Sequence, residues 1–246
     1  NHMPKPELNG LGATFAECEF RHSEAYSRLL EVLGYNDEFN NVIEIPAIRE
    51  RIDYLNTVLA NAKSTNHKEY VSSLLLFSIL IENVSLFSQF ATILSFTRFK
   101  GYMKNVSNII AWTSVDEQIH ANAGIYLINK IREEQPELLT DADIEDIYGL
   151  VDRSVELEAK ILDWIFEAGE IEMFSKEDLL NFMKYRVDDS LKKIGMKTRY
   201  NVTPEQYRPM TWFEEEVFAN SLDDFFAKRP VDYTKHDKSI TANDLF

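Results

Sequence analysis

The longest apolar stretch of the chain limits the possible folds most, because it must be either a membrane span or a buried helix. It runs from Val71 to Phe96 (VSSLLLFSILIENVSLFSQFATILSF), with Glu82 and Asn83 in its middle. An ionised carboxylate at the centre of a bilayer costs roughly 3 kcal/mol or more. We therefore expect the core helix of a soluble bundle and no membrane association. A carboxylate buried in such a helix needs a partner or a metal ion.

Helical periodicity extends over most of the remaining chain. Its 246 residues include only 8 Gly and 7 Pro, too few for a many-stranded sandwich or barrel. The recurrence of apolar residues and the capping signals predict helices over about 14–33, 46–62, 67–97, 102–134, 140–168 and 175–195. No long helix is expected in the Pro- and Gly-containing lead-in before Thr14. We expect one all-α helical domain over residues 1–227 and a flexible polar tail over residues 228–246.

Charge and cysteine content limit the partners and the compartment. The net charge is −15, which argues against binding a nucleic-acid backbone. Cys18 is the single cysteine, so no internal disulfide framework can form. A reducing, cytoplasmic location fits this composition.

Two Glu-x-x-His pairs are the strongest chemical signal. Glu19 precedes His22 by three residues, and Glu117 precedes His120 in the same way. On a helix, residues three apart share a face, so each pair can present a carboxylate and an imidazole to one point. With Glu82 from a third helix, this inventory predicts a two-metal carboxylate site. Oxygen and imidazole ligands suit iron, or manganese, better than a closed zinc site.

Tyr26 lies on the helical face of Glu19 and His22, about 6 Å along the axis from His22. An aromatic core residue is the commoner fate of such a tyrosine. A phenol beside an oxidising metal pair can instead lose an electron and a proton to it.

These residues resemble the small (beta, radical-generating) subunit of class I ribonucleotide reductase. The resemblance lies in Glu19-x-x-His22-Ser23-x-x-Tyr26, Ile81-Glu82-Asn83-Val84-x-x-Phe87-x-x-Phe90-Ala91 and Val115-Asp116-Glu117-Gln118-Ile119-His120. The stretch from Asp223 to Tyr233 and the short polar tail ending in Phe246 are also similar to the end of that family. The resemblance implies a ferritin-like helical bundle.

The resemblance also implies roles for individual residues. Glu19, His22, Glu82, Glu117 and His120 would bind two metal ions, iron or manganese. Tyr26 would carry a stable tyrosyl radical, and Asp116 would hydrogen-bond a histidine ligand. Tyr233 would relay the radical to the large (alpha) subunit, on which the C-terminal tail would dock. The family further implies a homodimer, while the need for an activating flavoprotein stays open. The holoenzyme would reduce ribonucleotides to deoxyribonucleotides.

The sequence departs from the family at one ligand. The family takes a sixth, an Asp or Glu, from a helix before the first Glu-x-x-His, where this chain has only Glu7 and Glu17. Glu7 lies in the lead-in, and Glu17 points away from Glu19 on the helix. The family's N-terminal tryptophan on the radical path is also missing. We therefore expect an N-terminally shortened small subunit.

Two other functions fit the same residues. One is a ferritin-like two-metal oxidase or oxygenase that acts on a small substrate of its own. The other is a non-catalytic helical interaction protein, in which the Glu and His side chains form a buried hydrogen-bond network.

Overall fold

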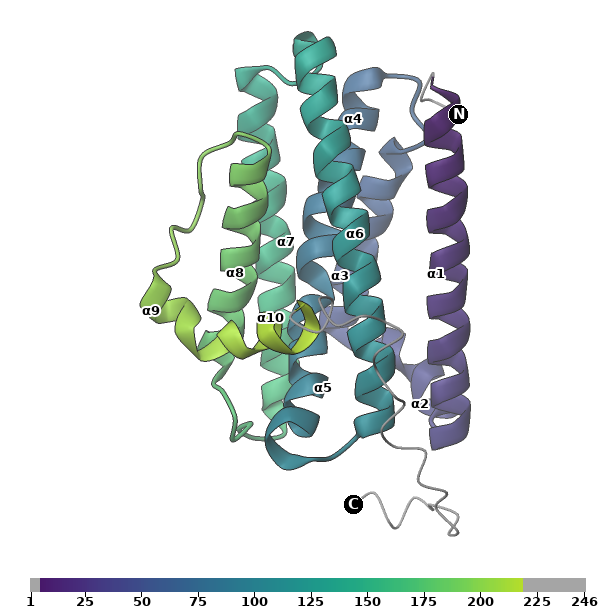
Figure 1. The fold of residues 1–246 in the computed structure, drawn as a ribbon, viewed down its shortest axis with the longest axis vertical. Coiled ribbons are helices and arrows are strands. Elements are labelled where there is room, and N and C mark those ends of the chain that lie inside the picture. Colours follow the sequence, from purple (N-terminus) through teal and green to yellow (C-terminus); the bar gives the residue numbers. More distant parts are fainter. Residues whose placement is uncertain (1–4, 219–246) are drawn as a thin grey trace, which may run out of the picture.

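The computed structural model describes residues 5–218, and all regular structure in that range is helical. Its elements are α1 (Pro6–Leu33), α2 (Asn36–Asn41), η1 (Val42–Glu44), α3 (Pro46–Asn61), α4 (His67–Leu76), η2 (Phe77–Ser85), α5 (Phe87–Lys100), α6 (Lys104–Glu134), η3 (Pro136–Leu138), α7 (Asp141–Glu167), α8 (Lys176–Lys193), α9 (Pro204–Tyr207), η4 (Arg208–Met210) and α10 (Thr211–Phe218). The long helices run side by side as a bundle (Figure 1). The predicted all-α architecture is confirmed. The predicted tail, Tyr233 and the end of the predicted domain lie outside the described residues.

The centre of the bundle forms where α6 packs against η2 and α5. Large side chains such as Ile79, Phe87 and Ile128 are fully buried in these three elements, as is Phe182 of α8. The stretch His67–Lys100 has the length and hydropathy of a membrane span, yet 72% of its most apolar window is buried inside the protein. This burial agrees with the core helix expected from the sequence.

The expected helix over residues 67–97 is continuous, but its middle segment, η2, is a π-helix. Such segments are rare and occur often at functional sites. Glu82 lies within it. Gly124 on α6 permits the close approach of η2, because a Cβ atom there would lie 1.8 Å from the Ser78 hydroxyl oxygen. The packing of α6 on η2 therefore depends on a glycine one turn beyond His120.

Helix α1 begins at Pro6, so the expectation of no long helix before Thr14 is wrong. Proline at the first helical turn suits a helix start, and Gly10 and Gly12 each cost only about 1 kcal/mol. Lys5 also pairs with Glu134 of α6 at 3.2 Å. Glu7 is therefore helical, but it lies twelve residues before Glu19, about 18 Å along the axis.

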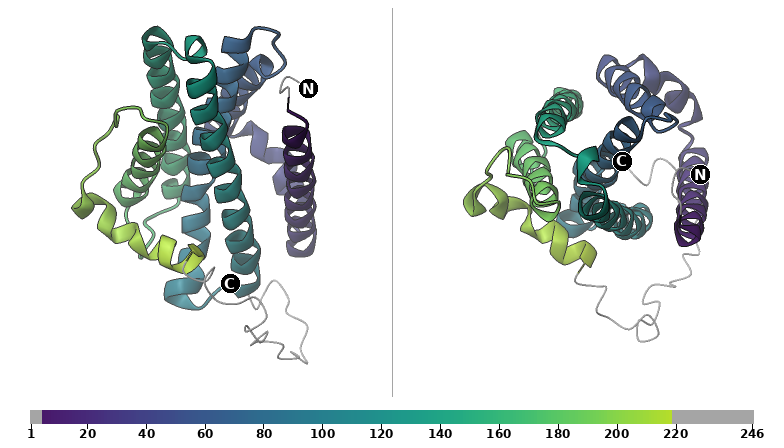
Figure 2. Two further views of the ribbon diagram at one scale, coloured as in Figure 1. Left: turned by 45° about the horizontal axis from the view of Figure 1, so that its top comes forward. Right: turned by 90° about the horizontal axis from the view of Figure 1, so that it is seen from above.

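Helix α1 stands at the edge of the bundle, beside α6 and apart from α7 and α8 (Figure 2). None of its residues is fully buried. Elsewhere in the bundle, Arg51 of α3 lies 3.0 Å from the buried Glu158 of α7. The short helices α2, α9 and α10 were not expected from the sequence.

Candidate metal centre

The structure brings the five predicted ligands together from three elements. Glu19 and His22 come from α1, Glu117 and His120 from α6, and Glu82 from η2. Helices α1 and α6 run antiparallel, so each Glu-x-x-His pair faces the other across the helix interface. The imidazole rings of His22 and His120 lie 6.4 Å apart between their centroids.

Two of the carboxylates reach both imidazoles, with one oxygen directed to each. Glu19 places Oε2 at 3.6 Å from Nδ1 of His22 and Oε1 at 3.0 Å from Nδ1 of His120. Glu117 places Oε1 at 3.3 Å from Nδ1 of His22 and Oε2 at 3.3 Å from Nδ1 of His120. Glu82 Oε2 lies 3.4 Å from Nδ1 of His120. The cluster thus has a His22 end and a His120 end, and Glu82 belongs to the second.

The two ends differ in burial. The side chains of Glu82, Glu117 and His120 are only 5%, 3% and 5% exposed, whereas that of Glu19 is 46% exposed. His22 is intermediate, at 11%. Consequently the ligand side chains from α6 and η2 lie inside the core, whereas Glu19 of α1, which contacts both imidazoles, is open to solvent.

Burial and mutual contact shift the ionisation of every member of the cluster. Contacts with Glu117 and Glu19 raise the pKa of His22 to about 11. Burial lowers the pKa of His120, but contacts with the three carboxylates outweigh it and raise the value to about 12. Burial raises the pKa of Glu82 to about 8. Burial also acts to raise the pKa of Glu117, but contacts with both histidines hold it well below its usual range. Without metal, the two histidines are therefore protonated, and their positive charges offset the repulsion between the neighbouring carboxylates.

The donor atoms of the cluster do not satisfy one another by hydrogen bonding, but they suit binding to metal ions. Nδ1 of His22 and Oε2 of Glu117 are buried and make no hydrogen bond of normal geometry among the described residues. Oxygen and imidazole donors of Glu19, Glu82, Glu117 and His120 all lie within 4.8 Å of one another. Three carboxylates and two imidazoles are ligands that iron and manganese accept.

Asp116, which the resemblance assigns to a histidine ligand, lies on the side of His22 that faces away from the cluster. Its Oδ2 is 3.1 Å from Nε2 of His22, so it fixes the ring that presents Nδ1 to the cluster. The Cys18 thiol also donates to this oxygen, at 3.4 Å. Cys18 was not predicted to be part of the site, although it directly precedes Glu19.

Tyr26 is half-buried between α1 and the core, two turns from Glu19. Burial raises the pKa of its phenol, and the charges of Glu117 and Glu19 act in the same direction, against an opposing contact with Thr113. Its hydroxyl makes no hydrogen bond of normal geometry within the described part of the chain. Neutral tyrosine is therefore the favoured form.

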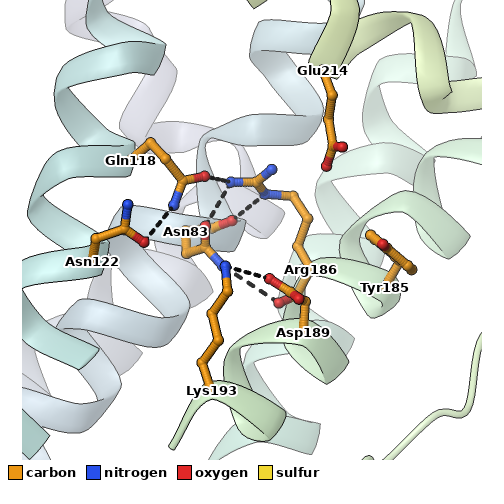
Figure 3. Close-up of a pocket in the computed structure, with 8 residues that line it drawn as sticks. All are labelled: Asn83, Gln118, Asn122, Tyr185, Arg186, Asp189, Lys193 and Glu214. Carbon is orange, nitrogen blue, oxygen red and sulfur yellow. Dashed lines mark hydrogen bonds and ion pairs between the residues drawn. The ribbon is translucent and has the colours of Figure 1, made fainter. Parts of the chain in front are cut away.

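A polar network that was not predicted from the sequence is centred on Arg186 (Figure 3). Arg186 of α8 is fully enclosed and donates to the backbone oxygen of Asn83 at 2.6 Å, to its Oδ1 at 2.6 Å and to Oε1 of Gln118 at 2.8 Å. Asn83 and Gln118 directly follow Glu82 and Glu117. The guanidinium carbon also lies 3.6 Å from the centre of the Phe87 ring. Arg186 thus joins the two elements that carry the buried carboxylates, beside a cavity of about 250 Å³.

The other carboxylates considered from the sequence do not join the cluster. Glu17 pairs with Arg21 at 2.8 Å on the exposed face of α1. Glu7 is remote along the same helix. The described residues therefore offer five candidate ligands, and of the two histidines only His120 contacts a carboxylate, Glu82, that the other does not reach within the cluster.

Comparison with known proteins identifies the family. The family described as "Ribonucleotide reductase, small chain" matches residues 1–209. The chain is 27% identical over 246 residues to a "Probable ribonucleoside-diphosphate reductase small subunit" of Invertebrate iridescent virus 3, covering 94% of this chain and 64% of that protein. It is 28% identical to the "Ribonucleoside-diphosphate reductase subunit beta" of Chlamydia pneumoniae, covering 94% of this chain and 68% of that one.

A solved structure shows the same fold. It is the "dimanganese(II)-NrdF" of Streptococcus sanguinis, with a TM-score of 0.70 and 18% identity, covering 83% of this chain and 70% of that one. The predicted ferritin-like bundle is thereby confirmed. The chain spans about two thirds of the length of the two named relatives. Since the family match extends over most of the sequence, the chain belongs to the ribonucleotide reductase small-chain family.

Proposed function

We propose that this chain is the metal-binding, radical-generating small subunit of an aerobic ribonucleotide reductase. The observation that carries the proposal is the arrangement of two imidazoles with two carboxylates shared between them. A bound pair of iron or manganese ions, once oxidised at the expense of oxygen, would supply the oxidising equivalent. The dimanganese relative supports manganese as well as iron.

In this proposal the protein side chains position the two ions. Glu19 and Glu117, which contact both imidazoles, would contribute to holding both ions, and His22 and His120 would each hold one. Glu82 would serve the ion held by His120. Asp116 orients the imidazole of His22 through its contact with Nε2.

Tyr26 would store the oxidising equivalent as a tyrosyl radical. Its raised pKa disfavours the phenolate, so the loss of an electron must be accompanied by the loss of the phenolic proton. The half-buried position limits access of solvent reductants to the radical.

The partners follow from the family. We expect a homodimer in the cytoplasm that docks through its C-terminal tail, ending in Phe246, on a large subunit that reduces ribonucleotides. Tyr233 would pass the radical across that contact. Removing the residues after Arg229 should abolish binding to the large subunit and leave metal content unchanged.

Metal loading tests the central claim. The chain is loaded anaerobically with Fe(II), desalted and analysed for iron, then exposed to oxygen and examined by electron paramagnetic resonance. Close to two metal ions per chain and a tyrosyl signal are expected. Tyr26→Phe should remove the signal and keep the metal.

Tyr54→Phe is the matched control for a half-buried tyrosine away from the cluster, because Tyr54 donates to the backbone oxygen of Leu150 at 2.8 Å. It should retain the radical signal. A signal that survives Tyr26→Phe would place the radical elsewhere. No bound metal would favour the non-catalytic hydrogen-bond network.

A further inference from the structure

The side of His22 that faces away from the cluster holds a second group of metal-ligand side chains. We propose that Cys18, His22 and Asp116 form a separate site for Zn²⁺ or a similar thiophilic divalent ion. Cys18 and His22 are four residues apart on one face of α1, and Asp116 comes from α6. This group contains a sulfur donor, which the carboxylate cluster lacks.

The three donor atoms form a triangle of the size that a tetrahedral ion requires. The distances are 3.6 Å from Sγ of Cys18 to Nε2 of His22, 3.4 Å from Sγ to Oδ2 of Asp116 and 3.1 Å from Nε2 to that oxygen. Bond lengths to zinc of about 2.3 Å for sulfur and 2.0–2.2 Å for nitrogen and oxygen give tetrahedral edges of about 3.4–3.6 Å. An ion could therefore enter with shifts of only a few tenths of an ångström.

A water molecule from solvent can supply the fourth ligand of this site. The Asp116 side chain is 41% exposed, and Cys18 is half-buried. Water can thus occupy the fourth position, as it does where zinc has three protein ligands. In the metal-free arrangement the thiol and the imidazole both lie within hydrogen-bonding range of the same carboxylate oxygen, and a bound ion would replace that crowded contact.

The shared imidazole couples the two sites. A neutral imidazole has one unprotonated nitrogen, so an ion on Nε2 leaves the proton on Nδ1, which faces the carboxylate cluster. Zinc bound at Cys18 should therefore lower the iron content of the cluster. This competition, but not the zinc site itself, rests on the proposed function.

Cobalt(II) is the probe for the site, because thiolate ligation gives it a charge-transfer band in the near ultraviolet. We expect the band when the metal-free full chain is titrated anaerobically, and we expect it to persist in Glu82→Gln, which impairs only the cluster. Asp116→Asn should weaken the cobalt affinity measured by this band about tenfold or more. Zn²⁺ should abolish the band and slow alkylation of Cys18 by iodoacetamide.

Glu17→Gln is the matched control, because Glu17 adjoins Cys18 but pairs with Arg21 on the outer face. It should leave the cobalt affinity unchanged. No thiolate band at saturating cobalt in either the unmodified chain or Glu82→Gln would overturn the proposal. Equal effects of Asp116→Asn and Glu17→Gln would also overturn it, since they would show a non-specific thiol complex.

The outcomes separate this proposal from the proposed function. A thiolate band with cobalt, in a chain that retains no iron when it is loaded with Fe(II) alone, would support the zinc site and contradict the function. Two cluster metals without any thiolate band would do the reverse.

Discussion

The two ends of the carboxylate cluster are built by different parts of the fold. The His120 end is formed mainly by α6 and η2, which pack on each other in the core. Arg186 joins them by donating to Asn83 of η2 and to Gln118 of α6. The His22 end depends on α1, a helix at the edge of the bundle with no fully buried residue. The same types of side chain therefore lie in two environments of different rigidity.

The two environments determine how well the ligands are positioned before metal binds. Side chains in a packed core are already fixed in their rotamers, so a metal ion at the His120 end finds its ligands in place. Segments with few buried contacts open locally at low free energy. We therefore expect the His120 position to fill first and the His22 position to bind more weakly.

Glu117→Ala should have the largest effect, because Glu117 is the buried carboxylate that reaches both imidazoles. Both metal ions should be lost, as measured by elemental analysis after anaerobic Fe(II) loading. Glu133→Ala, an exposed glutamate on the same helix, is the control and should keep both. Retention of one ion per chain by Glu117→Ala would show that the two ends assemble independently.

Lowering the pH should have the second largest effect on metal binding. His22 and His120 have pKa values of about 11 and 12 without metal, so both imidazoles are protonated at neutral pH and must lose a proton to bind. Glu82, with a pKa of about 8, is also protonated at neutral pH and is the third group that must lose a proton. Metal affinity should therefore fall as pH falls, by roughly a thousandfold per pH unit below the pKa of Glu82, where three protons are released, and by roughly a hundredfold above it, where two are released. A pH indicator in weakly buffered solution measures this release, and fewer than two protons released per chain on full metal loading would contradict it.

Glu82→Ala should affect one end only, because Glu82 contacts His120 and not His22. Metal content should fall sharply, to about one ion or fewer per chain, while the far-ultraviolet circular dichroism stays helical. Unchanged metal content would show that Glu82 is not a ligand. Loss of the helical signal would show that the buried carboxylate is needed for the fold.

Local sequence patterns predicted the helices and the cluster members that depend on them. Glu19 with His22 and Glu117 with His120 are pairs whose geometry is set by the helix itself, so their spacing was sufficient. Glu82 was recognised because a carboxylate in an apolar helix needs a partner. The six predicted helices correspond to α1, α3, the continuous α4–η2–α5, α6, α7 and α8.

Features that depend on contacts between distant segments could not be predicted in this way. The early start of α1 adjoins the contact between Lys5 and Glu134. The π-helix at Glu82 forms where Gly124 admits Ser78, and no local pattern marks that approach. Cys18 meets Asp116 only because α1 and α6 pack antiparallel. Arg186 likewise reaches Asn83 across 103 positions of the chain.

Arg186→Met should have the smallest effect on metal binding. It tests whether the hydrogen bonds of Arg186 hold Glu82 and Glu117 in position. The change leaves two oxygens of Asn83 and one of Gln118 without their donor, which should lower the free energy of unfolding by about 1–3 kcal/mol. Urea denaturation measures this. Lys192→Met, at an exposed position on the same helix, should stay within about 0.5 kcal/mol of the unmodified protein.

The metal affinity of Arg186→Met should also fall, by about tenfold, because Asn83 and Gln118 adjoin Glu82 and Glu117. Two ions should still bind at saturation. Reduced stability with unchanged affinity would mean that core packing alone fixes the two carboxylates, and that the rigidity of the His120 end does not depend on Arg186.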